Sequence, residues 1–117
     1  MPEPSLTPGD VMALVGQCRN HWLLLLKTGP NQVLDEAAAR ALQMAHLQHL
    51  FGLRARGKFA FFGPVADASD LVGIGVYLTA TREEAEALAA ADPAVIAGRF
   101  RAEIHGWFTL PGEQLPG

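Results

Sequence analysis

The sequence has few of the residues that build covalent or metal-dependent sites. Its 117 residues include a single cysteine, Cys18, which excludes an intrachain disulfide and a zinc site built on cysteines. A lone thiol is typical of a reducing compartment, and we expect Cys18 to be a small buried apolar side chain. The zinc-protease motif HExxH is also absent. We therefore expect neither a metal ion nor another cofactor.

Excess positive charge and long apolar runs are missing too. The formal net charge is −3 at pH 7, whereas a general nucleic-acid binder carries a basic face. The apolar run HWLLLLK, at residues 21–27, is far too short to cross a bilayer. The first ten residues lack the basic start and apolar core of a signal peptide. We expect a cytoplasmic protein whose partners include neither nucleic acid nor membrane.

Two widespread catalytic motifs are absent as well. The sequence contains no Gly-x-Ser-x-Gly and no glycine-rich phosphate loop, which disfavours serine-nucleophile and nucleotide chemistry. Apolar residues, by contrast, are plentiful, because hydrophobic residues make up 50% of the chain and charged residues 18%. This composition predicts one globular domain with a single core.

Periodicity and turn residues predict one helix followed by the order β-α-β-β-α-β. An N-terminal arm and an extra helix, capped by Thr7, occupy residues 1–19, the main domain occupies residues 20–110, and residues 111–117 form a tail. The expected strands span residues 21–29, 58–65, 71–80 and 99–110, and the main helices span residues 32–56 and the segment that Thr81 begins. This order is that of an α+β, ferredoxin-like fold, in which the helices cover one face of a four-stranded antiparallel sheet.

The other face of the sheet is expected to meet a partner. Four consecutive leucines at residues 23–26 place apolar side chains on both faces of the first strand. We expect Tyr77 and Trp107 on the face that the helices leave open. An open face of this kind indicates a homodimer through that face. The alternative is that the extra N-terminal helix covers it within one chain.

Two histidines lie on the long predicted helix, in the segment MAHLQHL. At 100° per residue His46 falls on the same side as Leu42 and Leu50, with His49 close by. A histidine within an apolar stripe is more often a hydrogen-bonded core residue than a catalytic one, and both interpretations stay open from the stripe alone. A metal site on His46 and His49 is a further alternative, which would need a third ligand.

Asp92 follows an alanine-rich helical segment and precedes Pro93. Asp-Pro is typical of a turn or of a helix start. A carboxylate at the C-terminus of a helix faces the negative end of the helix dipole, so we expect a cation or a hydrogen bond to compensate. A histidine would do so, because a His–Asp pair fixes the tautomer of the imidazole and makes it a better base.

Three segments together resemble the YciI-like (YCII-related) family. They are HLQHLFGLRARGKFAFFGP, TREEAEALAAADP and DPAVIAGRF, and the resemblance extends over residues 20–110. It implies a dimeric α+β barrel, in which two ferredoxin-like sheets pack face to face. It also implies a pocket where a helix histidine and the Asp-Pro aspartate form a catalytic pair, and by position these are His46 and Asp92.

The resemblance also implies a class of function. A characterised branch of the family eliminates HCl from chlorinated hydroxyquinone-type substrates. We therefore expect a cofactor-independent, lyase- or isomerase-like enzyme that acts on a small cyclic or aromatic molecule, with pocket walls from Leu50, Phe61, Gly63 and Pro64. The alternative is a dimeric module that binds a small ligand or a protein without catalysis. This sequence departs from the family pattern in its N-terminal extension, in Ala94, where a bulky aromatic often follows Asp-Pro, and in the additional His49.

Overall fold

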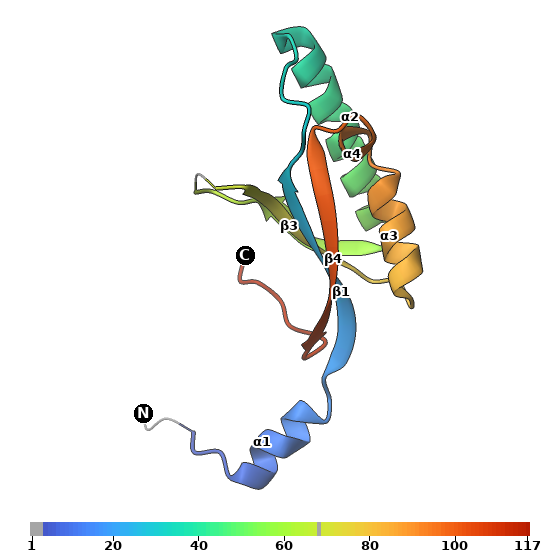
Figure 1. The fold of residues 1–117 in the computed structure, drawn as a ribbon. Helices are drawn as coiled ribbons and strands as arrows, with labels where there is room; N and C mark the ends of the chain where they lie inside the picture. The colour runs from blue at the N-terminus through green and yellow to red at the C-terminus, as the bar shows by residue number, and fades with distance from the viewer. Residues whose placement is uncertain (1–3, 68) are drawn as a thin grey trace.

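The computed structural model describes residues 4–67 and 69–117 and shows the expected order of elements, with one short helix added (Figure 1). The elements are α1 (Pro8–Val15), β1 (Arg19–Thr28), α2 (Glu36–Ala55), β2 (Phe59–Pro64), β3 (Leu71–Tyr77), α3 (Arg82–Ala90), α4 (Pro93–Ile96) and β4 (Phe100–Thr109). The four strands form one antiparallel sheet in the order β2-β3-β1-β4. The α+β, ferredoxin-like prediction is confirmed, while residues 1–3 of the expected arm lie outside the described residues. None of the described helices is both long and apolar enough to cross a membrane.

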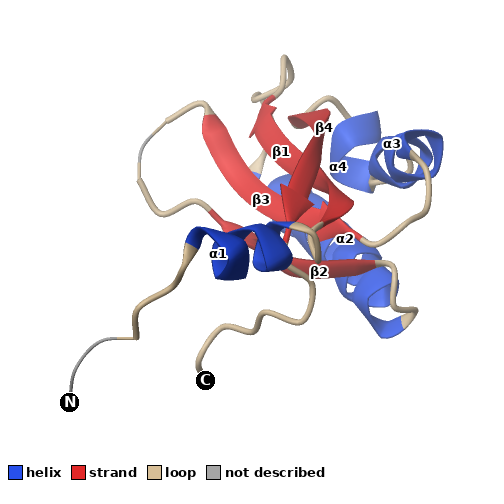
Figure 2. Cartoon of the chain, turned by 90° about the horizontal axis from the view of Figure 1, so that it is seen from below, coloured by secondary structure: helices blue, strands red, loops and turns tan. Residues whose placement is uncertain are grey.

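The core lies between the sheet and the helices α2, α3 and α4, which share one face of the sheet (Figure 2). Leu24 and Leu26 point into this core, whereas Leu23 and Leu25 alternate with them on the other face and are half-buried. The run of leucines therefore supplies both faces of β1, as its pattern predicts. The buried cluster consists of Leu24, Leu26, Leu50, Leu53, Phe59, Tyr77, Ala85, Ala89 and Ile104.

Tyr77 lies in this core, so its expected place on the open face was wrong. Glycines of β3 explain the difference. A Cβ atom on Gly75 would come within 2.2 Å of the Phe59 ring, so a glycine is needed for that ring to pack flat against the sheet. The centroid of the Phe59 ring lies 4.7 Å from that of Tyr77, and Tyr77 is only 1% exposed. The face of β3 with the small residues is therefore the face that the aromatic core fills.

Strand β2 contains a bulge that changes which of its side chains face inward. Ala60 pairs with Val76, but the register shifts before Gly63 pairs with Ile74. Phe61 lies within this irregular stretch and has a φ of 50°. This is a left-handed backbone conformation that residues other than glycine rarely adopt. The irregular stretch also contains Phe62, whose ring stacks on that of Phe59 with ring centroids 4.8 Å apart.

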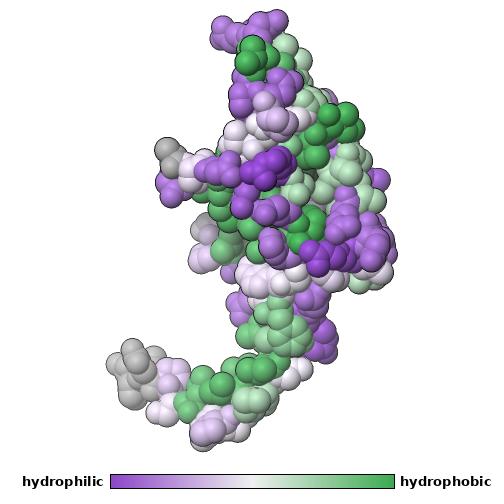
Figure 3. All heavy atoms as spheres, viewed as in Figure 1, coloured by the Kyte–Doolittle hydropathy of each residue, from purple (hydrophilic) through white to green (hydrophobic). Residues whose placement is uncertain are grey.

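Helix α1 stands apart from the sheet. Thr7 and Asp10 form a capping box at its start, yet none of its residues is buried. Figure 1 places α1 beyond the start of β1, and Figure 3 shows apolar side chains exposed over it. The alternative in which this helix covers the open sheet face within one chain was therefore wrong. Cys18, which follows α1, is only half-buried for the same reason.

Tyr77 offers a direct test of this core, because it is the only tyrosine of the chain. Burial raises the pKa of Tyr77 above its ordinary value of 10.0, and the negative charge of Asp92 raises it further. In the unfolded chain the phenol ionises at about pH 10, so above that pH the folded state holds a proton that the unfolded state releases, and stability falls as pH rises. We expect tyrosinate absorbance at about pH 10 only after unfolding in urea.

The control for this titration is Tyr77→Phe, which removes the absorbance change and also the loss of stability above about pH 10. If the folded wild-type protein titrates like a free tyrosine, Tyr77 is not in the core.

Candidate active site

His46 of α2 and Asp92, at the start of α4, meet inside the protein. Nδ1 of His46 and Oδ2 of Asp92 are 2.6 Å apart. Both residues are buried, with exposed fractions of 6% for His46 and 2% for Asp92. A contact this short between an imidazole and a carboxylate is a charge-assisted hydrogen bond. The structure thus brings together the two residues that the sequence singles out, although 46 positions separate them.

Asp92 holds α4 as well as His46. Its second oxygen, Oδ1, accepts a hydrogen bond from the backbone N–H of Ala94 at 2.9 Å, which makes Asp92 the N-cap of the short helix α4. Of the two structures that Asp-Pro indicates, a turn and a helix start, the structure therefore shows the helix start. An N-cap carboxylate faces the positive end of its helix dipole. For Asp92 this interaction with α4 offsets the unfavourable interaction with the negative end of the α3 dipole, which precedes it.

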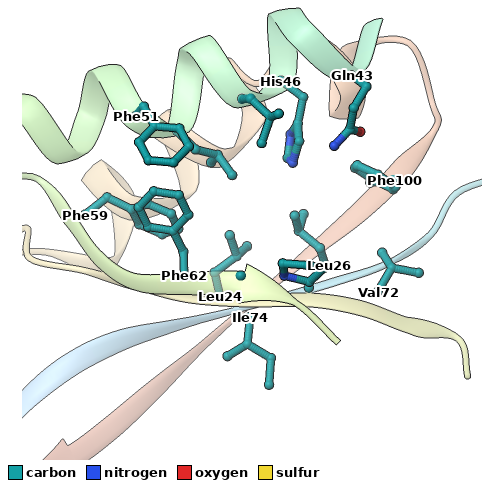
Figure 4. A pocket seen from close by; sticks show the side chains of 15 residues that line it. Leu24, Leu26, Gln43, His46, Phe51, Phe59, Phe62, Val72, Ile74 and Phe100 are labelled. Carbon is teal, nitrogen blue, oxygen red and sulfur yellow. The ribbon is translucent and has the colours of Figure 1, made fainter. Parts of the chain in front are cut away.

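The pair determines which nitrogen of His46 is free. A carboxylate only accepts hydrogen bonds, so the neutral imidazole carries its proton on Nδ1 and keeps a lone pair on Nε2. The ring of Phe100 packs edge-on against the imidazole, with centroids 5.1 Å apart. Figure 4 shows the His46 ring pointing from α2 into the space between the helix and the sheet. His46 can therefore act as a base through Nε2 and as an acid once that nitrogen is protonated.

A cavity of about 400 Å³ opens beside His46, between α2 and the sheet (Figure 4). His46 and Gln43 are the polar side chains of its wall. The apolar side chains of the wall come from Leu24, Leu26, Leu47, Leu50, Phe51, Phe59, Phe62, Pro64, Val72 and Phe100. Ile74 also borders the cavity, but its side chain points away from α2 (Figure 4). A concave, mostly apolar cavity with few polar groups is typical of a site for a small organic molecule.

Three of the four residues expected in the pocket wall line this cavity, namely Leu50, Gly63 and Pro64. The expectation for Phe61 was wrong, because its side chain is 53% exposed and lies outside the cavity. In a regular strand Phe61 would share the inward face with Phe59, since side chains alternate with a period of two. The bulge turns Phe61 outward and places Phe62 in the wall instead.

Several residues of the wall escaped sequence reasoning. Gln43 lies three positions before His46, so helical spacing could have indicated it, whereas Phe51 lies five positions after His46, a spacing that places it well around the helix. Phe62 depends on the bulge, and Phe100 depends on how β4 passes beneath α2, and neither feature has a local signal in the sequence.

His49 does not join the site. Its Nε2 donates a hydrogen bond to the backbone carbonyl of Leu88 at 2.9 Å, which ties α2 to α3. Across residues 4–67 and 69–117, no three His, Cys, Asp or Glu side chains gather in a way that could hold a metal ion. The alternative metal site on His46 and His49 has no third ligand among these residues.

Comparisons with known proteins agree with this fold. A family model described as the YCII-related domain matches residues 21–107, whereas no curated protein matches the chain. Among solved structures, the chain is similar to 5-chloro-2-hydroxyhydroquinone dehydrochlorinase from Burkholderia phenoliruptrix AC1100 in complex with 2,5-dihydroxybenzoquinone. That match has a TM-score of 0.57 and 23% identity, and covers 74% of this chain and 92% of the other. Since the family model spans most of the sequence, this chain belongs to the YCII-related family.

Proposed function

We propose that this protein is a cofactor-independent enzyme that carries out acid–base chemistry on a small cyclic or aromatic molecule. His46 is the general base and acid, and Asp92 is the positioning residue that holds its ring. One observation carries the proposal: the buried pair, with its 2.6 Å contact, lies at the wall of an otherwise apolar cavity of about 400 Å³. The solved structure with a similar fold is that of a dehydrochlorinase, and it holds 2,5-dihydroxybenzoquinone, a ring with polar substituents.

The size and lining of the cavity favour a ring as the substrate. A dry cavity of about 150 Å³ is enough to hold benzene, so the larger cavity here has room for a ring with substituents. The rings of Phe59 and Phe62 offer flat apolar surfaces for such a substrate. An apolar wall also strengthens charge interactions at His46, because little water screens them.

The chemistry requires only one proton acceptor that can later act as a donor. His46 Nε2 takes a proton from a carbon or hydroxyl of the ring, and Asp92 stabilises the imidazolium that forms. In an elimination, the electron pair of the broken C–H bond becomes a new double bond while the leaving group departs with its own pair. In an isomerisation, His46 returns the proton to another atom of the substrate. Neither reaction needs a redox cofactor.

We also propose that two copies of the chain pair through the open sheet face. On this face, Leu25 of β1 lies beside Ile74 of β3, and Ile74 is 37% exposed. Figure 4 shows the Ile74 side chain on the side of β3 away from α2. On its other side Leu25 lies opposite Glu103 of β4, which forms an ion pair of 2.8 Å with Lys27. A second copy would remove these apolar side chains from water, and an isolated chain rarely leaves a large apolar patch exposed.

The role of His46 can be tested with His46→Gln. A general base contributes a factor of about 10² to 10⁴ to a rate, so we expect turnover of any ring substrate found by screening to fall by that factor. The matched control is His49→Gln, on the same helix but outside the cavity, which should retain turnover. If His46→Gln turns substrate over within a few-fold of wild type, His46 is not the base. If ring compounds bind but none is turned over by the wild-type protein, the chain is a binding module.

The role of Asp92 can be tested separately from its contribution to the fold. In Asp92→Asn the side-chain oxygen can still cap α4, because Asn and Asp are equally good N-caps. The amide NH₂ then faces Nδ1 of His46 and moves the ring proton to Nε2, where the base was. We expect a free energy of unfolding within about 1–2 kcal/mol of wild type but turnover reduced about as much as in His46→Gln. Asp92→Ala should lose more stability in urea unfolding, and wild-type turnover in Asp92→Asn would contradict this role.

If two copies pair through the open sheet face, a charge placed on that face should lower the mass of the protein in solution from that of a dimer to that of a monomer. Leu25→Glu places a carboxylate in the centre of the proposed contact, where it would be buried without a partner. We expect the variant to be monomeric by size exclusion with light scattering, and the wild-type protein to be a dimer. The matched control is Met44→Glu on α2, which is 56% exposed and away from the sheet. A wild-type monomer, or a Leu25→Glu dimer as stable as wild type, would exclude this interface.

A further inference from the structure

A second hollow, here called the outer hollow, lies next to the cavity along α2. Its volume is about 280 Å³, and Glu36, Arg40, Ala94 and Arg99 are among its lining residues. Gln43 lines both the cavity and the outer hollow. The residues that α2 contributes to the two spaces recur every three or four positions and so share one side of the helix. The outer hollow therefore continues the cavity toward the N-terminus of α2, with Gln43 between them.

The two spaces differ in charge. No Lys, Arg, Asp or Glu side chain lines the cavity, whereas the outer hollow is lined by two guanidinium groups and one carboxylate. That carboxylate, on Glu36, already pairs with Arg40 at 2.8 Å. Within the described part of the chain no carboxylate pairs with Arg99. The outer hollow thus has one positive charge in excess, next to a site that is otherwise apolar.

Arg99 is held in place while keeping free donors. Its backbone N–H donates to the carbonyl of Ala94 at 2.9 Å, and its own carbonyl accepts from Gln32 Nε2 at 2.8 Å. One guanidinium nitrogen, Nη1, donates to the Gln32 carbonyl at 3.2 Å. A guanidinium has five N–H donors, so most remain for a ligand. The next residue, Phe100, packs against His46, which links the position of Arg99 to that of the catalytic pair.

We propose that the substrate carries a carboxylate, which binds Arg99 and Arg40 in the outer hollow while the ring lies in the cavity beside His46. This inference rests on the proposed function for the reaction, but the binding step can be measured without turnover. Six positions separate Arg40 from His46, or about 9 Å along the helix at 1.5 Å per residue. That spacing fits a ring whose carboxylate is attached by a short linker, and Gln43 lies where its amide can bond a polar atom of the linker.

The test compares two probes by isothermal titration calorimetry, phenylpropionate and phenylpropanol, which share the ring and the linker length and end in a carboxylate or in a neutral hydroxyl. We expect the carboxylate to bind about tenfold more tightly than the alcohol, since a hydrogen bond to a charged group contributes about this factor. In Arg99→Met most of the preference should disappear while the affinity for the alcohol stays the same, and adding Arg40→Met should remove the rest. Arg99→Lys keeps the charge and should retain part of the preference. Glu36→Gln removes the ion-pair partner of Arg40 and should increase the preference for the carboxylate.

Two results would overturn the proposal. One is equal affinity of the wild-type protein for the two probes. The other is a preference for the carboxylate that persists when Arg99→Met and Arg40→Met are combined, with an unchanged melting temperature showing that the variant is folded. In His46→Gln the carboxylate preference should remain, so a failure of the catalytic assignment and a failure of the outer hollow give different results.

Discussion

The carboxylate of Asp92 is the interaction on which the site depends. It is buried, and a buried carboxylate is stable only when its oxygens are paired. One oxygen caps α4 and the other binds the imidazole of α2, so α2, α4 and the start of β4 are drawn to a common point. Burial raises the pKa of Tyr77 in the core, and the same negative charge raises it further. The cavity exists where it does because this pair holds the middle of α2 against the start of α4, which leads into β4.

The opposite wall of the cavity depends on small residues and on irregular backbone. Gly75 leaves room for the Phe59 ring to lie on the sheet, and the bulge in β2 adds Phe62 beside it. These rings close one end of the cavity, and Gln43 lies at the end toward the N-terminus of α2 (Figure 4). The result is a largely apolar cavity that meets an excess positive charge just outside, beyond Gln43. The shape of the cavity and the charge beside it are therefore both consistent with the substrate that we propose, a ring that carries a carboxylate.

The features that could be predicted from the sequence are those with a local signal. The helix stripe around His46, the leucines of β1 and the caps at Thr7 and Thr81 follow from spacing and side-chain chemistry, and they appear as expected. The meeting of His46 with Asp92 depends on tertiary structure, and only the family resemblance indicated it. Phe61 was misplaced because a bulge breaks the period of two. Tyr77 was misplaced because the face of β3 that is buried is the one with glycines, whose small size makes it look empty in the sequence.

The central claim is that His46 holds its proton on Nδ1, against Asp92, and keeps Nε2 free for chemistry in the cavity. Nitrogen-15 NMR of the imidazole in the folded wild-type protein measures this directly. The account predicts that, in the neutral form, Nδ1 of His46 has the chemical shift of a protonated nitrogen and Nε2 that of a nitrogen with a lone pair. A neutral His46 with its proton on Nε2 would contradict the account, because the base would then face Asp92 instead of the substrate.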